Sequence, residues 1–556
     1  MKTKLISLIR PMLFLVLGLS LVLACQKINP LDDVGLVVNS DIYTSPVLIR
    51  FVNAKTTATN QPTNFSVKIS GKDAALVVMS EGSKDFKATN GLITLALDTK
   101  AIPTPANPIS FTVSAEISGF TPVSQQITIT SADAMEFQVQ AVEYANPAEG
   151  TSALVKQSSL TNNTTPEISI VTPKTSTMTE SSNVSLTSGT QLLDASGNVL
   201  TGNQLESRIV HYGTNTENSV LSFPGGFAAP NVIGENGNAI NGGVVFQTAG
   251  FLNVDMFVGG KEVKSFSKPV DVKMDLNSGL INPTTGGTVK AGETIPVWSL
   301  NEETGQWKYE SLATVTSGSD GKLKADFKVT HLSAWNVDWW SATCNTPLTM
   351  TIKMPNPNAR KVYWVEILDA RGQYLSGLYY NTSWSAGVEL YDGFITTIPR
   401  VPNTNVRIVV FNGRGYDKVT ETELFNPCNK GSITVTVAPP VIPEKINVNF
   451  VMDAKCSNKN VTIKYSGYVS LYKQSENISK AINAYVKEGT TTVVLENNVP
   501  YVVEVPYDGK VYTTTFTPSK GTTTFPAEKS ITATSTYNTS TNTLKVNGKI
   551  TISNCK

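Results

Sequence analysis

The stretch Leu252-Asn253-Val254-Asp255-Met256-Phe257-Val258 decides the fold class of this chain. Apolar residues occupy every second position, so one face of an extended strand is apolar and the opposite face is half-solvated. The same period recurs in Phe111-Thr112-Val113-Ser114-Ala115 and in Leu323-Lys324-Ala325-Asp326-Phe327. Turn residues such as Asp194-Ala195-Ser196-Gly197-Asn198 separate such stretches. The pattern predicts an all-β protein of tandem antiparallel β-sandwiches.

The length of 556 residues allows about four compact domains. Shifts in composition predict these parts: a signal peptide at 1–24, a tether at 25–46, a β-sandwich at 47–142, a Ser/Thr/Asn-rich connector at 143–182, a β-rich module at 183–342, a β-sandwich at 343–438, a Pro-rich linker at 439–444 and a β-sandwich at 445–556. Fully extended, four such domains would reach on the order of 150 Å. Residues 475–489 also fit one short helix.

The charge of the chain is nearly balanced, with 45 Lys and Arg against 44 Asp and Glu. Such a chain has little electrostatic attraction to nucleic acid, so we expect no nucleic-acid partner. His211 and His331 are the only histidines, too few for a multi-histidine metal site. We expect no metal and no cofactor.

The sequence also contains no G-x-S-x-G, H-E-x-x-H, P-loop or EF-hand pattern. The paired acids Asp32-Asp33 and Glu302-Glu303 fall in the tether and in a turn, where solvated charges are the expected interpretation. We therefore expect no catalytic residues. A glycosidase built from distant carboxylates stays open, because their separation is set by the fold.

The N-terminus has the form of an export signal. Positive residues precede an apolar run at 12–23 that is too short to span a bilayer; they are Lys2, Lys4 and Arg10. The run ends in Val22-Leu23-Ala24-Cys25, which resembles the lipobox of bacterial lipoproteins, although Leu23 is larger than usual there. The resemblance implies a lipid on Cys25 that attaches the chain to a membrane. Ordinary cleavage after Ala24 is the alternative.

Gln26, which follows the lipobox, resembles the residue of lipoproteins that are sorted to the outer membrane. We expect an outer-membrane, cell-surface protein, with the periplasmic face as the alternative.

Four cysteines remain once Cys25 is assigned to the lipid: Cys344, Cys428, Cys456 and Cys555. An even number in an exported chain predicts two disulfides with three connectivities. We expect Cys344 with Cys428 and Cys456 with Cys555, because each pair then brackets one domain. Metal ligation is disfavoured, because no C-x-x-C spacing occurs.

One internal segment resembles a known family. Thr294-Ile295-Pro296-Val297-Trp298, Glu303-Thr304-Gly305-Gln306-Trp307 and Phe327 to Asn336, with its His331-Leu332-Ser333-Ala334-Trp335-Asn336 end, are similar to a segment of bacterial surface lipoproteins and of the ectodomains of cartilage intermediate layer protein. Residues 47–142 and 345–438 more loosely resemble the carboxypeptidase-regulatory-like, or transthyretin-like, sandwich. The resemblance implies Ig-like or transthyretin-like extracellular modules with a structural or adhesive role.

Within this segment, Trp298 and Trp307 flank a polar hairpin loop at 301–305. We expect the two rings to pair across antiparallel strands. His331 shares the strand parity of Phe327 and Val329, which predicts a structural histidine on the core face rather than a ligand or base.

All seven tryptophans lie between Trp298 and Trp384. Exposed aromatic rings stack on sugars, and neighbours on a strand face opposite sides, so Trp339, Trp340 and Trp384 are the candidate ligand-binding residues. Packing within the sandwiches is the alternative. The sequence predicts a lipid-anchored, non-catalytic scaffold or adhesion protein that contacts envelope proteins, matrix or glycans. The alternative is a glycan-binding accessory lipoprotein of a polysaccharide uptake or degradation system.

Overall fold

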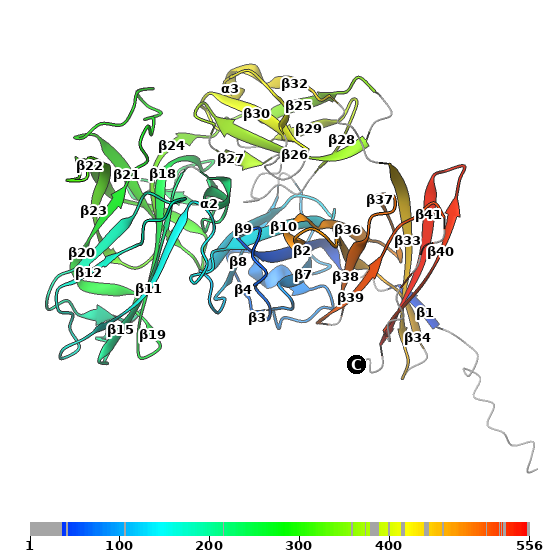
Figure 1. Cartoon of the computed structure of the whole chain (residues 1–556), viewed down its shortest axis with the longest axis horizontal. Helices are drawn as coiled ribbons and strands as arrows, with labels where there is room; N and C mark the ends of the chain where they lie inside the picture. Colours follow the sequence, from blue (N-terminus) through cyan, green and yellow to red (C-terminus); the bar gives the residue numbers. More distant parts are fainter. Residues whose placement is uncertain are drawn as a thin grey trace, which may run out of the picture.

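The prediction of an all-β fold is confirmed (Figure 1). The computed structural model describes residues 36–39 and 43–552, except 105–106, 215, 357–359, 373, 378–387, 399–400, 413–417, 439–443, 459–460, 508, 522, 524 and 526–529. Helical structure in this part of the chain is limited to single turns: η1 (Ala74–Leu76), α2 (Glu217–Leu221), α3 (Pro427–Lys430) and η2 (Ile478–Lys480). Within the described residues, no helix has the length and apolar character needed to cross a membrane.

The prediction of a short helix at residues 475–489 is wrong. Only η2 is helical there, and β36 (Ile482–Val486) follows it and pairs antiparallel with β35 (Gly467–Lys473). Strand pairing in the folded domain overrides a weak local propensity.

The first sandwich packs two small sheets around one apolar core. One sheet has the order β10 (Met135–Ala141), β2 (Thr44–Asn53), β7 (Leu92–Leu97) and β5 (Val77–Met79). The other has the order β4 (Lys68–Ser70), β8 (Ile109–Ala115) and β9 (Val123–Ile129), and a hairpin of β3 (Phe65–Ser66) and β6 (Lys87–Ala88) lies beside them.

The central module is one large sheet that curls around a shared core. Its order is β11 (Thr151–Ser159), β15 (Gln204–Tyr212), β18 (Val244–Val258), β24 (Ala334–Ala342), β21 (Thr294–Asn301), β22 (Gln306–Ser317), β23 (Leu323–His331), β20 (Ser265–Asp275), β13 (Ser182–Leu186) and β12 (Ile168–Val171). Short strands pair at its margins: β14 (Leu192–Leu193), β16 (Ala228–Ala229), β17 (Val232–Ile233) and β19 (Lys261–Glu262). The Lys156 side chain of β11 donates to the Ser169 carbonyl of β12 at 3.0 Å, so the two ends of the sheet approach each other.

The connector expected at 143–182 is not a linker in the structure. It supplies β11 and β12, the first and last strands along the path of the large sheet. The stretch at 158–165, at the end of β11 and in the connection to β12, is rich in serine, threonine and asparagine, and that composition resembles a linker.

The third sandwich has one sheet of β29 (Ile395–Ile398), β25 (Leu348–Lys353) and β32 (Ser432–Thr436). Its other sheet contains β27 (Tyr374–Gly377), β26 (Arg360–Asp369), β30 (Val406–Phe411), β31 (Lys418–Glu421) and β28 (Val388–Tyr391). The predicted disulfide between Cys344 and Cys428 is confirmed, and it ties the start of this sandwich to α3. Cys456 is also disulfide-bonded. Its predicted partner Cys555 lies outside the described residues, so that pairing stays a prediction.

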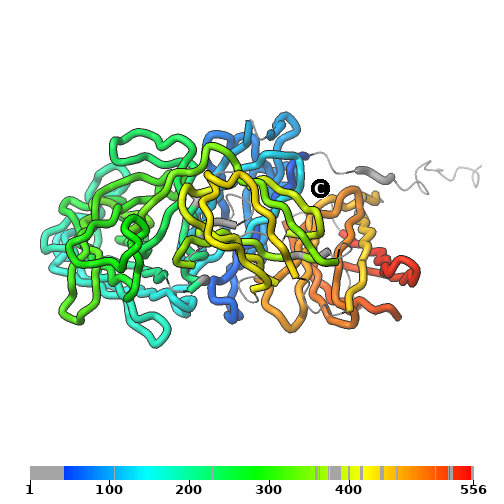
Figure 2. The backbone as a smooth tube through the Cα atoms, turned by 90° about the horizontal axis from the view of Figure 1, so that it is seen from above, coloured from blue at the N-terminus to red at the C-terminus, as the bar shows by residue number. Residues whose placement is uncertain are grey.

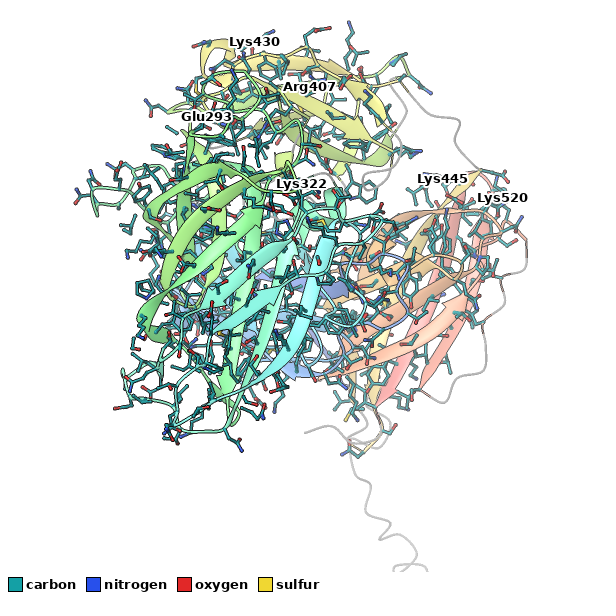
Figure 3. The ribbon with its side chains drawn as sticks, turned by 60° about the vertical axis from the view of Figure 1, so that its left-hand side comes forward. Glu293, Lys322, Arg407, Lys430, Lys445 and Lys520 are labelled. Carbon is teal, nitrogen blue, oxygen red and sulfur yellow. A yellow bond between two sulfur atoms is a disulfide. The ribbon has the colours of Figure 1, made fainter. Side chains whose placement is uncertain are left out.

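The last sandwich has one sheet of β34 (Val461–Lys464), β33 (Lys445–Cys456), β41 (Thr543–Ile552) and β40 (Ile531–Asn538), with β37 (Thr490–Glu496) also paired to β33. Its second sheet contains β36, β35, β38 (Tyr501–Tyr507) and β39 (Lys510–Phe516). Charged side chains lie on several modules, for example Arg407 and Lys430 on the third sandwich and Lys445 and Lys520 on the last (Figure 3). This spread fits the formal net charge of +1.

The three sandwiches share one feature that antiparallel alternation does not predict. In each of them the first long strand pairs in parallel with the last strand: β2 with β10, β25 with β32 and β33 with β41. The chain therefore enters and leaves each sandwich along two neighbouring strands that run in the same direction.

The N-terminal tether is shorter than expected. Residues 36–39 form β1 (Leu36–Asn39), which pairs in parallel with β34 of the last sandwich. Residues 44–46 already belong to β2. Residues 36–39, which were expected to belong to the tether, thus pair with the C-terminal domain.

The chain is not an extended row of domains, because its last sandwich docks on its first (Figures 1 and 2). Arg50 of β2 donates from Nη1 and Nη2 to Oε2 of Glu504 in β38, each at 3.1 Å. Both side chains are buried, at 2% and 7% exposure. An apolar cluster surrounds this contact and joins Leu48 and Leu92 to Tyr468.

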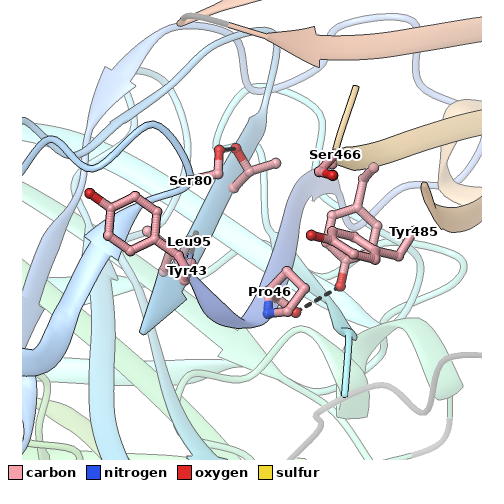
Figure 4. A pocket seen from close by; sticks show the side chains of 10 residues that line it. Tyr43, Pro46, Ser80, Leu95, Ser466 and Tyr485 are labelled. Atoms are coloured by element: carbon pink, nitrogen blue, oxygen red, sulfur yellow. Dashed lines mark hydrogen bonds between the residues drawn. The ribbon is translucent and has the colours of Figure 1, made fainter. Parts of the chain in front are cut away.

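The Tyr468 hydroxyl completes this interface by donating to the Pro46 carbonyl at 2.9 Å. Figure 4 shows the dashed line that ends at Pro46. A crevice of about 30 Å³ remains between Tyr43, Ser80 and Tyr485. That volume holds about two water molecules, so the contact is closely packed rather than a ligand site.

Candidate functional site

The tryptophans are mostly core residues. Trp298, Trp307 and Trp335 are each 1% exposed, and Trp339 is 7% exposed. Trp340 is the exception among the three candidates, with 43% of its surface exposed. Trp384 lies outside the described residues. The expected opposition of Trp339 and Trp340 is therefore seen, and one of the two faces solvent.

Trp340 lies on a partly exposed aromatic surface. Its ring meets the buried Trp298 edge-on, with centroids 6.5 Å apart, and Tyr309 meets Trp298 in the same way at 5.6 Å. The exposed Leu312 is paired with Pro296 on the same face of the sheet. We call Trp340, Tyr309 and Leu312 the Trp340 patch.

The predicted pairing of Trp298 with Trp307 is wrong. The turn of the β21–β22 hairpin pairs Asn301 with Gln306, and this register places Trp298 opposite Tyr309 and Trp307 opposite Leu300. Both tryptophans instead pack on Phe246, with ring centroids 5.2 Å away in each case. The rings thus belong to one core rather than to a ladder across the hairpin.

A polar cavity of about 470 Å³ lies where the β21–β22 hairpin, the β23–β24 turn and the β18–β19 hairpin meet. Charged side chains dominate its lining, among them Asp255, Glu262, Lys264, Glu302, Glu310 and His331. The first sandwich borders this cavity, because its Ser124 donates to the Glu302 carbonyl at 2.7 Å and its Lys68 pairs with Glu303 at 2.8 Å.

Two carboxyl groups of this cavity hold protons more tightly than usual. Burial, followed by the charges of Glu116 and Glu262, raises the pKa of Asp255. Burial, followed by the charges of Asp255 and Glu116, raises the pKa of Glu302. Glu302 was expected to be a solvated turn charge like its neighbour Glu303. Glu303 meets that expectation with a 70% exposed side chain, and Glu302 does not.

A second cluster in the cavity contains a serine, a histidine and a carboxylate, but their bonds do not form a nucleophile relay. Ser299 Oγ donates to Oε1 of Glu310 at 2.8 Å, and His331 Nε2 lies 3.3 Å from the same oxygen. A catalytic serine must give its proton to the histidine. Here the serine proton is directed at the carboxylate, which leaves Ser299 unactivated.

Glu310 is ionised in this arrangement. Burial opposes its charge, but hydrogen bonds from His331, Ser299 and Lys308 outweigh burial and lower its pKa to about 2. The His331 ring rests on Trp335, with centroids 4.8 Å apart, and its side chain is 34% exposed, so its predicted structural role stays a prediction.

His211 is enclosed by the central module. It is 1% exposed and its Nδ1 lies 2.6 Å from Ser182 Oγ. Burial lowers its pKa to about 4, so the ring is neutral near pH 7. Across the described ranges, no three His, Cys, Asp or Glu side chains are grouped so that they could hold a metal ion.

Neither a protein-family profile nor a curated protein matches this chain significantly. The resemblance of residues 294–338 to surface-lipoprotein segments therefore stays a prediction.

Solved structures similar to it include the C-terminal fragment of the pilus adhesin SpaC from Lactobacillus rhamnosus GG, with 7% identity, a TM-score of 0.16 and coverage of 38% of this chain and 98% of that chain. A streptococcal ancillary pilin has 14% identity, a TM-score of 0.14 and coverage of 47% and 93%. The longer SpaC structure has 9% identity, a TM-score of 0.16 and coverage of 92% and 57%. TM-scores this low do not establish a shared fold, so neither the architecture nor the role of this chain is taken from these proteins.

Proposed function

We propose that this protein is a lipid-anchored, non-catalytic scaffold at the cell surface, which presents its central module away from the membrane. The observation that carries the proposal is the pairing of β1 with β34 together with the docking of the last sandwich on the first. Strand β1 and the last sandwich lie at one end of the molecule, the central module lies at the other, and the first sandwich lies between them (Figure 1).

The distance to the membrane follows from the length of the tether. Fully extended, the segment from Cys25 to Leu36 spans at most about 40 Å, so an acyl chain on Cys25 would hold the terminal sandwiches close to the bilayer. The central module would then face outward. The bonding of Ser299 to Glu310 and the enclosure of His211 support a role without catalysis.

Substitution of the lipidation residue tests the anchor. We expect Cys25→Ser to abolish incorporation of labelled palmitate and to move the protein from the membrane fraction to the soluble fraction, because a thiol is needed for acylation. Labelling of Cys25→Ser at the wild-type level would contradict the anchor.

The orientation is tested by an epitope tag in the exposed turn at 318–322 between β22 and β23. An antibody should bind it on intact cells carrying the otherwise wild-type chain. Binding only after permeabilisation would place the module on the periplasmic side.

The Trp340 patch favours glycan binding as a second candidate function. An exposed indole with a neighbouring tyrosine offers a stacking face of the kind that sugars use. We expect Trp340→Ala to weaken retention on a bound polysaccharide by about two- to twelvefold, since loss of one stacked ring costs on the order of 0.5 to 1.5 kcal/mol.

Affinity electrophoresis against a panel of polysaccharides measures this effect. Leu312→Ala is the matched control for exposed apolar surface without a stacking ring, and it should change retention less. A protein that no polysaccharide in the panel retards, with or without Trp340, would exclude the second candidate for those glycans.

A further inference from the structure

Strand β40 is an uncharged edge strand of the last sandwich. Its eight residues, Ile531-Thr532-Ala533-Thr534-Ser535-Thr536-Tyr537-Asn538, contain no charge and no proline. It pairs with β41 without a register shift along its whole length, and among the described residues β41 is its only strand partner. Figures 1 and 2 place the β40–β41 hairpin at the outer end of the last sandwich.

Edge strands are normally protected from pairing with other chains. Lysine, proline, a bulge or a very short strand blocks the free backbone groups. Other margins of this protein carry such devices: β31 contains Lys418 and Glu421, and β1 and β12 have four residues each. None of these devices is found within β40, so its outer backbone groups are suited to accept another strand.

The side chains of β40 leave room for such a strand. Ile531, Ala533, Ser535 and Tyr537 face the core but are only half-buried, whereas the alternate residues are exposed. A strand added beside β40 would cover the inner row. The exposed threonines would meet similar polar side chains if the added strand had the same sequence.

A second copy of β40 would give suitable neighbours both to the inner row of half-buried side chains and to the outer row of exposed side chains. In an antiparallel pair centred on Thr534, Thr532 lies opposite Thr536 of the other copy and Thr534 lies opposite itself. On the inner row, Ile531 then lies opposite Tyr537 and Ala533 opposite Ser535. Threonine pairs and aromatic pairs with β-branched residues are favourable across strands, and no charge opposes a like charge.

We propose that two copies of this protein associate through β40, in an antiparallel pair centred on Thr534, to form one continuous sheet across a two-fold axis. Such isologous contacts close on themselves and stop at a dimer. The inference does not depend on the lipid anchor. If the anchor is present, confinement to a membrane raises the effective concentration of the two edges.

A pair of charge variants tests the register. In Thr532→Lys/Thr536→Lys, lysines face lysines in the dimer. In Thr532→Lys/Thr536→Glu, the same exposed positions bring each lysine opposite a glutamate. Sedimentation velocity of the full-length protein in mild detergent, over a concentration series, should show dimerisation by the wild type. The dimer Kd should rise at least about tenfold in the double-lysine variant and stay near the wild-type value in the Lys/Glu variant.

Thr534→Cys provides an independent measurement, because the proposed axis brings the two cysteines face to face. Mild oxidation should produce a disulfide-linked dimer from Thr534→Cys and much less from Thr536→Cys. A wild-type protein that stays monomeric throughout the series would overturn the proposal. Equal behaviour of the two charge variants would overturn it as well, because another surface would then hold the dimer.

Discussion

Replacing Glu504 with alanine should weaken the docking of the last sandwich on the first by about 3 to 5 kcal/mol. The substitution leaves the Arg50 guanidinium, which is 2% exposed, buried between the two domains without its counter-ion. Hydrogen exchange of the amides in β2 and β38 measures the effect, because these strands carry the two charges and lose protection when the domains separate. The exchange of amides in the third sandwich should not change.

The double variant Arg50→Leu/Glu504→Leu separates the buried charge from the contact itself. It should recover most of the lost protection, because no isolated charge remains in an apolar interface. The exposed pair of Lys87 and Asp85 is the matched control, with side chains 59% and 71% exposed. Lys87→Ala should change stability by no more than about 1 kcal/mol. An equally small effect of Glu504→Ala would show that the two sandwiches are not held together through this pair.

Removal of the Cys344–Cys428 disulfide should destabilise the third sandwich by about 4 to 5 kcal/mol. The bond closes a loop with a sequence separation of 84, and without it the unfolded chain gains the corresponding conformational entropy. Pulse proteolysis in increasing urea, followed through peptides of residues 343–438, measures the change in this domain alone.

The double variant Cys344→Ser/Cys428→Ser is preferable to either single variant, because it leaves no free thiol to exchange with other cysteines. In this double variant, unfolding of the third sandwich should be insensitive to reductant. In the wild type, unfolding of the same domain should shift to lower urea when the disulfide is reduced. A double variant as stable as the oxidised wild type would contradict the entropic argument. The first sandwich contains no cysteine, and its unfolding serves as the internal control.

The alternation of apolar and polar residues predicted those features of the fold that depend on a single strand. Leu252 to Val258 reads as a strand in the sequence and forms part of β18, and the spacing of Cys344 and Cys428 predicted their bond. What the alternation did not predict depends on two distant segments at once. The same residues would alternate equally well if β2 and β10 were antiparallel, so the direction of their pairing leaves no local trace.

The docking of the terminal sandwiches is equally hidden in the sequence. Arg50 interrupts an otherwise apolar run in β2, and this was its only local signal. Its partner Glu504 is 454 positions away, so neither residue identifies the other.

At the candidate site, too, features of a single strand were predicted from the sequence, and features that depend on other segments were not. Strand parity predicted that Trp339 and Trp340 face opposite sides, and one of them is exposed. The register of the β21–β22 hairpin, which pairs Asn301 with Gln306 and so places Trp307 opposite Leu300 rather than Trp298, depends on the turn and was not predicted. Glu302 looked like its neighbour Glu303 because the contact of its backbone with Ser124 of the first sandwich leaves no trace in the local sequence.

The parallel pairing of first and last strands has a mechanical consequence. When a tethered protein is pulled by something attached at its far end, tension enters the first sandwich through β2 and leaves through β10, which run in the same direction. The force then shears the two strands along each other. Their hydrogen bonds are loaded at the same time instead of breaking one after another from one end. The arrangement recurs in β25 with β32 and in β33 with β41, which gives each of these sandwiches a shear clamp along the line of force.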